Sequence, residues 1–212
     1  MNRIYVLVSV WIVLFAGCRK RASDEINSGA VENSTYRNDY FGLSVKLPSE
    51  WSVQDKETQQ KLMNLGRKRV QGDDKNLKAV IKASEMQTVN LFAAFKHPIG
   101  TPVPYNPNIM CLAERVRHMP GIKRGKDYHF HSKRLFESSQ MEVSFPKEVS
   151  TEELGGHDFD VMYVELPITG MTIRQKHYAT IMKGYALVFI VSFTNGEEES
   201  ALDNVLSSVT FE

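Results

Sequence analysis

Two long, apolar-rich segments, residues 171–182 and 185–193, are separated only by Lys183 and Gly184. A two-residue link of this kind is typical of a tight β-hairpin, in which we expect Gly184 to adopt a positive φ angle. The hairpin makes the two strands antiparallel neighbours. Residues 159–166 form a third strong strand pattern just before them, so this half of the chain predicts an antiparallel sheet.

The clearest helical pattern covers residues 197–209, because apolar residues recur there at the spacing of one helix face. These apolar residues are Leu202, Val205, Leu206 and Val209. Asn195, followed three residues later by Glu198, is a capping signal for the start of this helix. The remaining predicted elements are helices over residues 57–70 and 125–138 and strands over residues 43–47, 89–95, 108–114 and 141–145. Strands and helices do not alternate regularly, so the predicted fold class is α+β, an antiparallel β-sheet flanked by helices.

The first eighteen residues have the pattern of a secretory signal. Arg3 precedes an uncharged run over residues 4–17, which is shorter than the roughly 20 apolar residues needed to cross a bilayer. The run ends in Ala16-Gly17-Cys18, which resembles a bacterial lipobox, although Phe15 stands where such motifs usually have Leu. We predict a lipoprotein signal peptide over residues 1–17 and lipidation of Cys18. A plain secretory signal and an uncleaved membrane anchor are the alternatives.

Lipidation of Cys18 implies a location in the bacterial cell envelope. Arg19 follows it, whereas Asp at this position favours inner-membrane retention in enterobacterial lipoproteins, so the periplasmic face of the outer membrane is preferred. Residues 18–35 are polar and lack aromatic side chains, and such a segment buries too little apolar surface to order itself. We therefore predict a lipidated, flexible tether over residues 18–35 and one folded domain over residues 36–212.

Charge and cysteine content narrow the possible functions. The whole chain has 26 Lys and Arg against 25 Asp and Glu, and one of the cations, Arg3, lies in the signal peptide. The mature chain is thus neutral, and its composition gives no sign of nucleic-acid binding, which requires a clustered basic face. Cys111 has no second cysteine to pair with once Cys18 is lipidated. We expect Cys111 to be a small core residue, the alternative being a nucleophile.

Both ends of the predicted domain resemble PsbP-like domains, whose fold is shared with a Ran-binding nuclear import factor. The sequence YFGLSV at residues 40–45, with Leu47-Pro48 and Trp51, resembles their opening strand. Residues 184–211 resemble their closing hairpin strand, acidic helix and final strand, and residues 106–109 are similar to bacterial lipoproteins of this type. The resemblance implies a PsbP-like α/β/α sandwich. Known members of this family bind partners or assist complexes, and they share no set of catalytic residues. The resemblance therefore implies a similar non-catalytic role.

Histidines and aspartates are the candidate metal ligands and catalytic groups. His129 and His131 lie in a predicted helix, where their side chains diverge by about 200°, so we expect two exposed histidines rather than a metal site. Asp158 and Asp160 share one face of a strand, where we expect an exposed edge. The alternative function is a hydrolase or metal-dependent enzyme whose site is assembled from His129, His131, His157 and Asp160.

Two further surfaces are candidate binding sites. Arg174, Lys176 and Lys183 form a basic stripe with Thr172 and Tyr178 that would dock an acidic partner, the alternative being a solvated face. Trp51 and the proline-rich loop over residues 98–107 would suit a small ligand. The prediction from sequence is a lipid-anchored, non-enzymatic envelope accessory or protein-interaction module. We expect a protein partner, whose identity the sequence does not indicate. We expect no nucleic-acid partner, no cofactor, no metal site and no catalytic residues.

Overall fold

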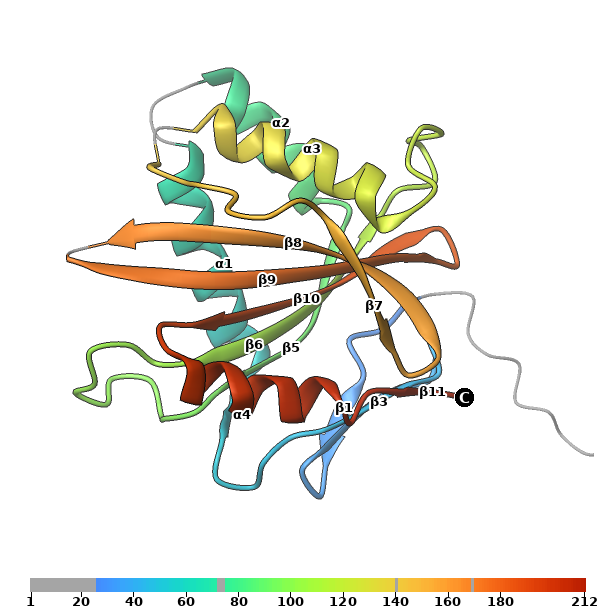
Figure 1. Cartoon of the computed structure of the whole chain (residues 1–212). Helices are drawn as coiled ribbons and strands as arrows, with labels where there is room; N and C mark the ends of the chain where they lie inside the picture. The colour runs from blue at the N-terminus through green and yellow to red at the C-terminus, as the bar shows by residue number, and fades with distance from the viewer. Residues whose placement is uncertain (1–25, 72–74, 140, 169) are drawn as a thin grey trace, which may run out of the picture.

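The structure, a computed structural model, describes residues 26–71, 75–139, 141–168 and 170–212 (Figure 1). The predicted signal peptide and the lipidation site Cys18 lie outside the described residues, and both stay predictions. The described residues form two antiparallel sheets and four helices, which confirms the α+β class.

The large sheet has seven strands in the order β4-β5-β6-β10-β9-β8-β7, each antiparallel to its neighbours. Its strands are β4 (Ser52–Val53), β5 (Thr88–Phe95), β6 (Asn108–Arg115), β7 (Ser150–Leu154), β8 (His157–Ile168), β9 (Met171–Met182) and β10 (Tyr185–Phe193). The predicted hairpin joins β9 to β10. Its turn has positive φ angles at both Lys183 (53°) and Gly184 (83°), the geometry that matches the twist of the flanking strands.

The small sheet corrects the predicted domain boundary. It has the order β1-β2-β3-β11, formed by β1 (Ala30–Glu32), β2 (Thr35–Asn38), β3 (Leu43–Lys46) and β11 (Thr210–Phe211). The buried Asn38 side chain donates a hydrogen bond to the carbonyl oxygen of Asn27 at 2.9 Å, and the Tyr36 hydroxyl donates to that of Ser28 at 3.1 Å. Residues 26–35 therefore belong to the fold, and the boundary predicted at Tyr36 lies too late.

Helices cover both faces of the large sheet (Figure 1). One face carries α1 (Lys56–Gln71), α2 (Lys75–Glu85) and α3 (Gly125–Glu137), whereas α4 (Gly196–Leu206) packs on the other beside the small sheet. The predictions of α1, α3 and α4 are confirmed, and α2 was not predicted. The strand predicted over residues 141–145 is wrong, because only the single bridge between Ser144 and Glu165 forms there.

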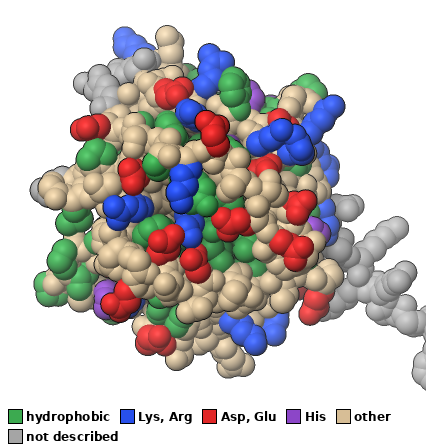
Figure 2. Space-filling model, in the orientation of Figure 1, with side chains coloured by type: hydrophobic (Ala, Val, Ile, Leu, Met, Phe, Trp, Pro, Cys, Tyr) green, Lys and Arg blue, Asp and Glu red, His purple; other side chains and the backbone are tan. Residues whose placement is uncertain are grey.

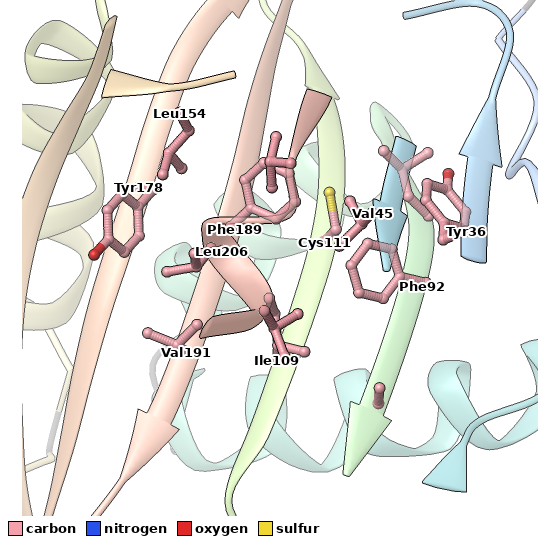
Figure 3. Packing of buried hydrophobic residues seen from close by; sticks show 14 of the residues in the cluster. Tyr36, Val45, Phe92, Ile109, Cys111, Leu154, Tyr178, Phe189, Val191 and Leu206 are labelled. Atoms are coloured by element: carbon pink, nitrogen blue, oxygen red, sulfur yellow. The ribbon is translucent and has the colours of Figure 1, made fainter. Parts of the chain in front are cut away.

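The main core fills the space between the large sheet, α4 and the small sheet. Figure 3 shows large side chains from several strands meeting there, among them Tyr36, Phe92, Phe189 and Leu206. Cys111 is 1% exposed in this core, and burial raises the pKa of its thiol well above the ordinary value, which confirms the prediction of a core residue. The predicted α4 stripe is also confirmed, because Leu202, Val205, Leu206 and Val209 are all buried. Trp51 is buried in the same core, which argues against its use as a ligand platform.

Candidate functional site

A cleft of about 580 Å³ opens between α2 and α3 on the outer side of the large sheet. This volume falls within the range of about 300–1,000 Å³ that is typical of ligand pockets. The walls are mainly apolar: α2 contributes Leu77 and Val80, α3 contributes Leu135, and the segment before α3 contributes Met119 and Ile122. We call this feature the α2–α3 groove.

The spacing of these residues along α3 and β6 places their side chains on the side of each element that faces the groove. Tyr128, Ser132 and Leu135 lie at the i, i+4 and i+7 positions of α3, so they share one helix face. Glu114 projects from β6 to the same side as Leu112, because side chains two residues apart share a face of the sheet. The groove thus has two helical walls and a floor that includes a carboxylate.

Glu114 braces the two walls of the groove. Its Oε1 accepts a hydrogen bond from the Ser84 hydroxyl of α2 at 2.7 Å, and its Oε2 accepts one from the Tyr128 hydroxyl of α3 at 2.8 Å. Burial, together with the nearby Glu114 charge, raises the pKa of Tyr128 well above its ordinary value. The phenol therefore remains a hydrogen-bond donor, and a single carboxylate fixes the spacing of the helices.

The sheet also fixes the start of α3. Asp160 of β8 accepts hydrogen bonds from the Lys126 backbone N–H at 2.7 Å and from the Thr151 hydroxyl at 2.9 Å. At Gly125, a Cβ atom would overlap the carbonyl oxygen of Ala179, so only glycine allows this close approach. Asp160 therefore serves as a helix-capping group, while Asp158 is exposed, and the two do not act as a carboxylate pair.

His129, predicted to be exposed, is instead buried on the inner side of α3, whereas His131 is exposed as predicted. The Nε2 of His129 lies 2.8 Å from the carbonyl oxygen of Asp160, and its Nδ1 has no hydrogen-bond partner in the described structure. Burial lowers the pKa of His129. His157, the first residue of β8, packs edge-on against the Phe211 ring. Two residues of the alternative enzyme site, His129 and Asp160, therefore meet, but through the Asp160 backbone carbonyl. His131 lines the groove and His157 contacts Phe211, so the four side chains do not form one site. Nowhere in the described ranges do three or more potential metal-binding side chains gather.

A second buried histidine, His177, was missed by the sequence analysis. It lies on β9 under α3, with its Nε2 2.9 Å from Oε1 of Gln175 and its ring 6.0 Å from that of Phe136. Burial and the neighbouring His129 lower its pKa to about 3. A single histidine within a predicted strand does not indicate from the sequence whether its side chain is buried.

The predicted basic stripe does not form a docking surface. Lys176 is buried and pairs with α4, its Nζ lying 2.7 Å from Oε1 of Glu199 and 3.0 Å from Oδ1 of Asp203. Arg174 pairs with Glu165 at 3.3 Å, and Lys183 donates to the carbonyl oxygen of Tyr40. The acidic partner of Lys176 is thus the protein's own C-terminal helix. Figure 2 shows Asp and Glu side chains among a few Lys and Arg on the side of the molecule that carries α4.

The helical layer differs in charge from the rest of the molecule. Helices α1, α2 and α3 together contain eleven Lys and Arg residues but only four Asp and Glu. In the remainder of this nearly neutral chain, acidic residues are therefore in excess. The same helices carry exposed apolar side chains, namely Leu65 (60% exposed), Val80 (57%) and Phe130 (59%). The groove thus lies in a surface that is both basic and partly apolar.

Comparison with known proteins supports the fold. No family model matches the sequence, and a search of curated proteins gives no match. The solution structure of cyanobacterial PsbP (CyanoP) from Synechocystis sp. PCC 6803 is similar, with a TM-score of 0.50 and 14% sequence identity over 87% of this chain and 96% of that chain. This likeness, together with the helices on both faces of the sheet, shows the PsbP-like fold.

A mycobacterial protein is a weaker structural match. LpqN, involved in cell envelope biogenesis of Mycobacterium tuberculosis, matches with a TM-score of 0.42 and 14% identity over 79% of this chain and 83% of that chain. In the described part of the chain, none of the helices combines the length and the apolar character needed to span a membrane.

Proposed function

We propose that the protein is a lipid-anchored, non-enzymatic interaction module of the bacterial cell envelope. Its α2–α3 groove would receive an acidic, amphipathic segment of a protein partner. The observation that carries the proposal is the groove itself, an open cleft with apolar walls in the most basic layer of the molecule. The anchor is the lipid expected on Cys18.

The chemistry of the groove favours this kind of partner. A groove between two helices commonly takes the apolar face of an amphipathic helix, which is read through side chains about one turn apart. Val80 and Leu135 offer apolar contacts on the two walls, and Arg134 is an exposed cation that also lines the groove. Carboxylates on the polar face of the bound segment would pair with such cations and steer its approach.

Site-specific photo-crosslinking in cells tests the groove directly. A photoreactive amino acid replaces Val80 in the groove or, as a control, Ile99, which is 50% exposed in the proline-rich loop. We expect a discrete protein adduct from position 80 and none of the same mass from position 99. Combining position 80 with Arg134→Glu should reduce the adduct at least twofold, whereas Lys82→Glu, on the opposite side of α2, should leave it unchanged. Equal adducts at both positions, or an adduct that persists after Arg134→Glu, would contradict the proposal.

Intact mass of the membrane-extracted protein tests the anchor separately. We expect a mature chain that begins at Cys18 and carries acyl mass, and Cys18→Ser should release or mis-process the protein. A mature chain that begins elsewhere, or one without acyl mass, would overturn the anchor and leave the crosslinking result standing.

A further inference from the structure

The described chain begins beside a basic end of the molecule. Ile26 lines an open depression together with Met86, Arg115, Arg117 and aromatic residues of two other segments. Those aromatic residues are Tyr40 and Tyr185. In Figure 1, the start of the described chain and the β9–β10 turn lie at the same side of the molecule. The predicted tether therefore joins the domain beside this depression.

The length of the tether limits how far this end can lie from the membrane. Eight residue steps separate Cys18 from Ile26. A fully extended chain spans at most about 3.6 Å per residue, so the separation cannot exceed about 30 Å. With a lipid on Cys18 in the bilayer, the surface around Ile26 cannot lie more than about 30 Å from the headgroups, so it is within reach of them.

The side chains at this end suit contact with a lipid surface. Arg115, Arg117 and Lys183 are exposed, and Met86 is 72% exposed. Among the described residues that line the depression there is no Asp or Glu. Cations mixed with aromatic and apolar side chains are typical of protein surfaces that rest on anionic membranes.

Hydrogen-bond, cation–π and aromatic contacts hold this surface together. The Arg117 guanidinium donates a hydrogen bond to the carbonyl oxygen of Lys183 at 3.0 Å, and the Lys183 ammonium lies 5.4 Å from the centre of the Tyr40 ring. The Tyr40 and Tyr185 rings meet edge to face at 5.8 Å. The loop before α3, the β9–β10 turn and the segment after β2 therefore form one continuous surface.

We propose that this surface, the Arg115 patch (Tyr40, Met86, Arg115, Arg117, Lys183 and Tyr185), lies against anionic phospholipid headgroups and orients the anchored domain. The proposal rests on the lipid anchor of the proposed function and adds a second, electrostatic contact to it. Each cation near an anionic surface is worth roughly fivefold in partitioning. Helix α4, which contains four acidic and no basic residues, would be repelled by the same lipids, which favours one orientation.

Depth-dependent quenching of a single probe tests the orientation in the lipidated protein. Cys111 is buried and Cys18 would carry lipid, so a cysteine introduced at position 86 or 149 is the single reactive thiol. Met86→Cys reports on the patch, and Val149→Cys, at an exposed position outside it, is the matched control. Each is labelled with an environment-sensitive dye. Vesicles contain nitroxide-labelled lipid, in either pure phosphatidylcholine or a mixture with about one-third phosphatidylglycerol.

We expect at least twofold stronger quenching at position 86 than at position 149 in the anionic vesicles, with the difference lost in pure phosphatidylcholine. Arg115→Glu with Arg117→Glu should abolish the difference, whereas Lys46→Glu with Lys147→Glu, outside the patch, should preserve it. Flotation of the protein with equal quenching at both positions would overturn the orientation and leave the anchor intact. Failure of the wild-type protein to float with vesicles would overturn the anchor and the orientation together.

Discussion

The two faces of the large sheet are built on different principles. On the α4 face, buried aromatic and aliphatic side chains form one continuous core, and the buried Lys176 is paired with two carboxylates. On the α1–α3 face, the buried apolar residues form two smaller clusters, a groove stays open, and a buried histidine nitrogen lacks a described partner. The first face is closed and stabilises the fold, whereas the second keeps an open groove.

The largest effect should come from a cavity on the α4 face. Leu206→Ala removes a side chain that is 3% exposed, and such substitutions cost about 2–5 kcal/mol, a large share of a typical 5–15 kcal/mol total. Val80→Ala, at a 57% exposed position in the groove, should cost no more than about 0.5 kcal/mol. Chemical denaturation of both variants measures the difference. A similar loss of unfolding free energy in the two variants would show that the two faces contribute equally to stability.

Acid should weaken the α1–α3 face next. The pKa of His177 is lowered to about 3 in the folded protein, below the ordinary value near 6.5, by burial and by His129. The unfolded chain therefore takes up protons below about pH 6.5 while the folded chain does not. The free energy of unfolding should fall as pH drops from about 6.5 toward 3, by about 2 kcal/mol at pH 5 from this group alone.

Two variants isolate the source of this pH dependence. His177→Gln should flatten the dependence between pH 6.5 and 5, whereas His131→Gln, at an exposed position on α3, should leave it unchanged. Denaturation midpoints across that pH range give the answer. A His177→Gln protein with the wild-type pH profile would assign the acid sensitivity to other groups.

Local sequence patterns account for the elements that were predicted well. The β9–β10 hairpin follows from its two-residue turn, and α4 follows from its apolar stripe and its cap, in which the Asn195 side chain accepts from the Glu198 N–H at 3.0 Å. Strand β1 was missed because all its residues are exposed, and exposed residues leave no alternating pattern. Helix α2 was missed although Leu77, Val80 and Ile81 lie at i, i+3 and i+4, the spacing of one helix face.

The groove was less predictable than the fold because its parts are distant in the sequence. Glu114, Ser84 and Tyr128 come from a strand and two helices, and the carboxylate meets the two hydroxyls only after the sheet and helices have packed. The inward turn of His129 likewise depends on where α3 docks on β8, which its own sequence does not specify. Periodicity predicts which face of an element is buried more reliably than which polar residues meet.

The smallest effect should come from Glu114→Gln, which keeps the shape of the side chain and removes its charge. Both hydrogen bonds then lose their ionised acceptor, and one carboxylate oxygen is replaced by an amide that no longer accepts. The charged carboxylate is half-buried, so relief of its desolvation offsets part of the loss, and we expect about 1 kcal/mol of destabilisation. Glu153→Gln, at an exposed position on β7, is the matched control and should be neutral.

The location of the Glu114→Gln effect is more informative than its size. If this carboxylate holds α2 and α3 together, faster amide hydrogen exchange should be confined to these helices, and α4 should keep the wild-type rate. Crosslinking from position 80 should fall in the same variant, because the two walls no longer keep their spacing. Exchange that rises equally on both faces of the sheet would show a general loss of stability, and the brace would then have no specific role in the groove.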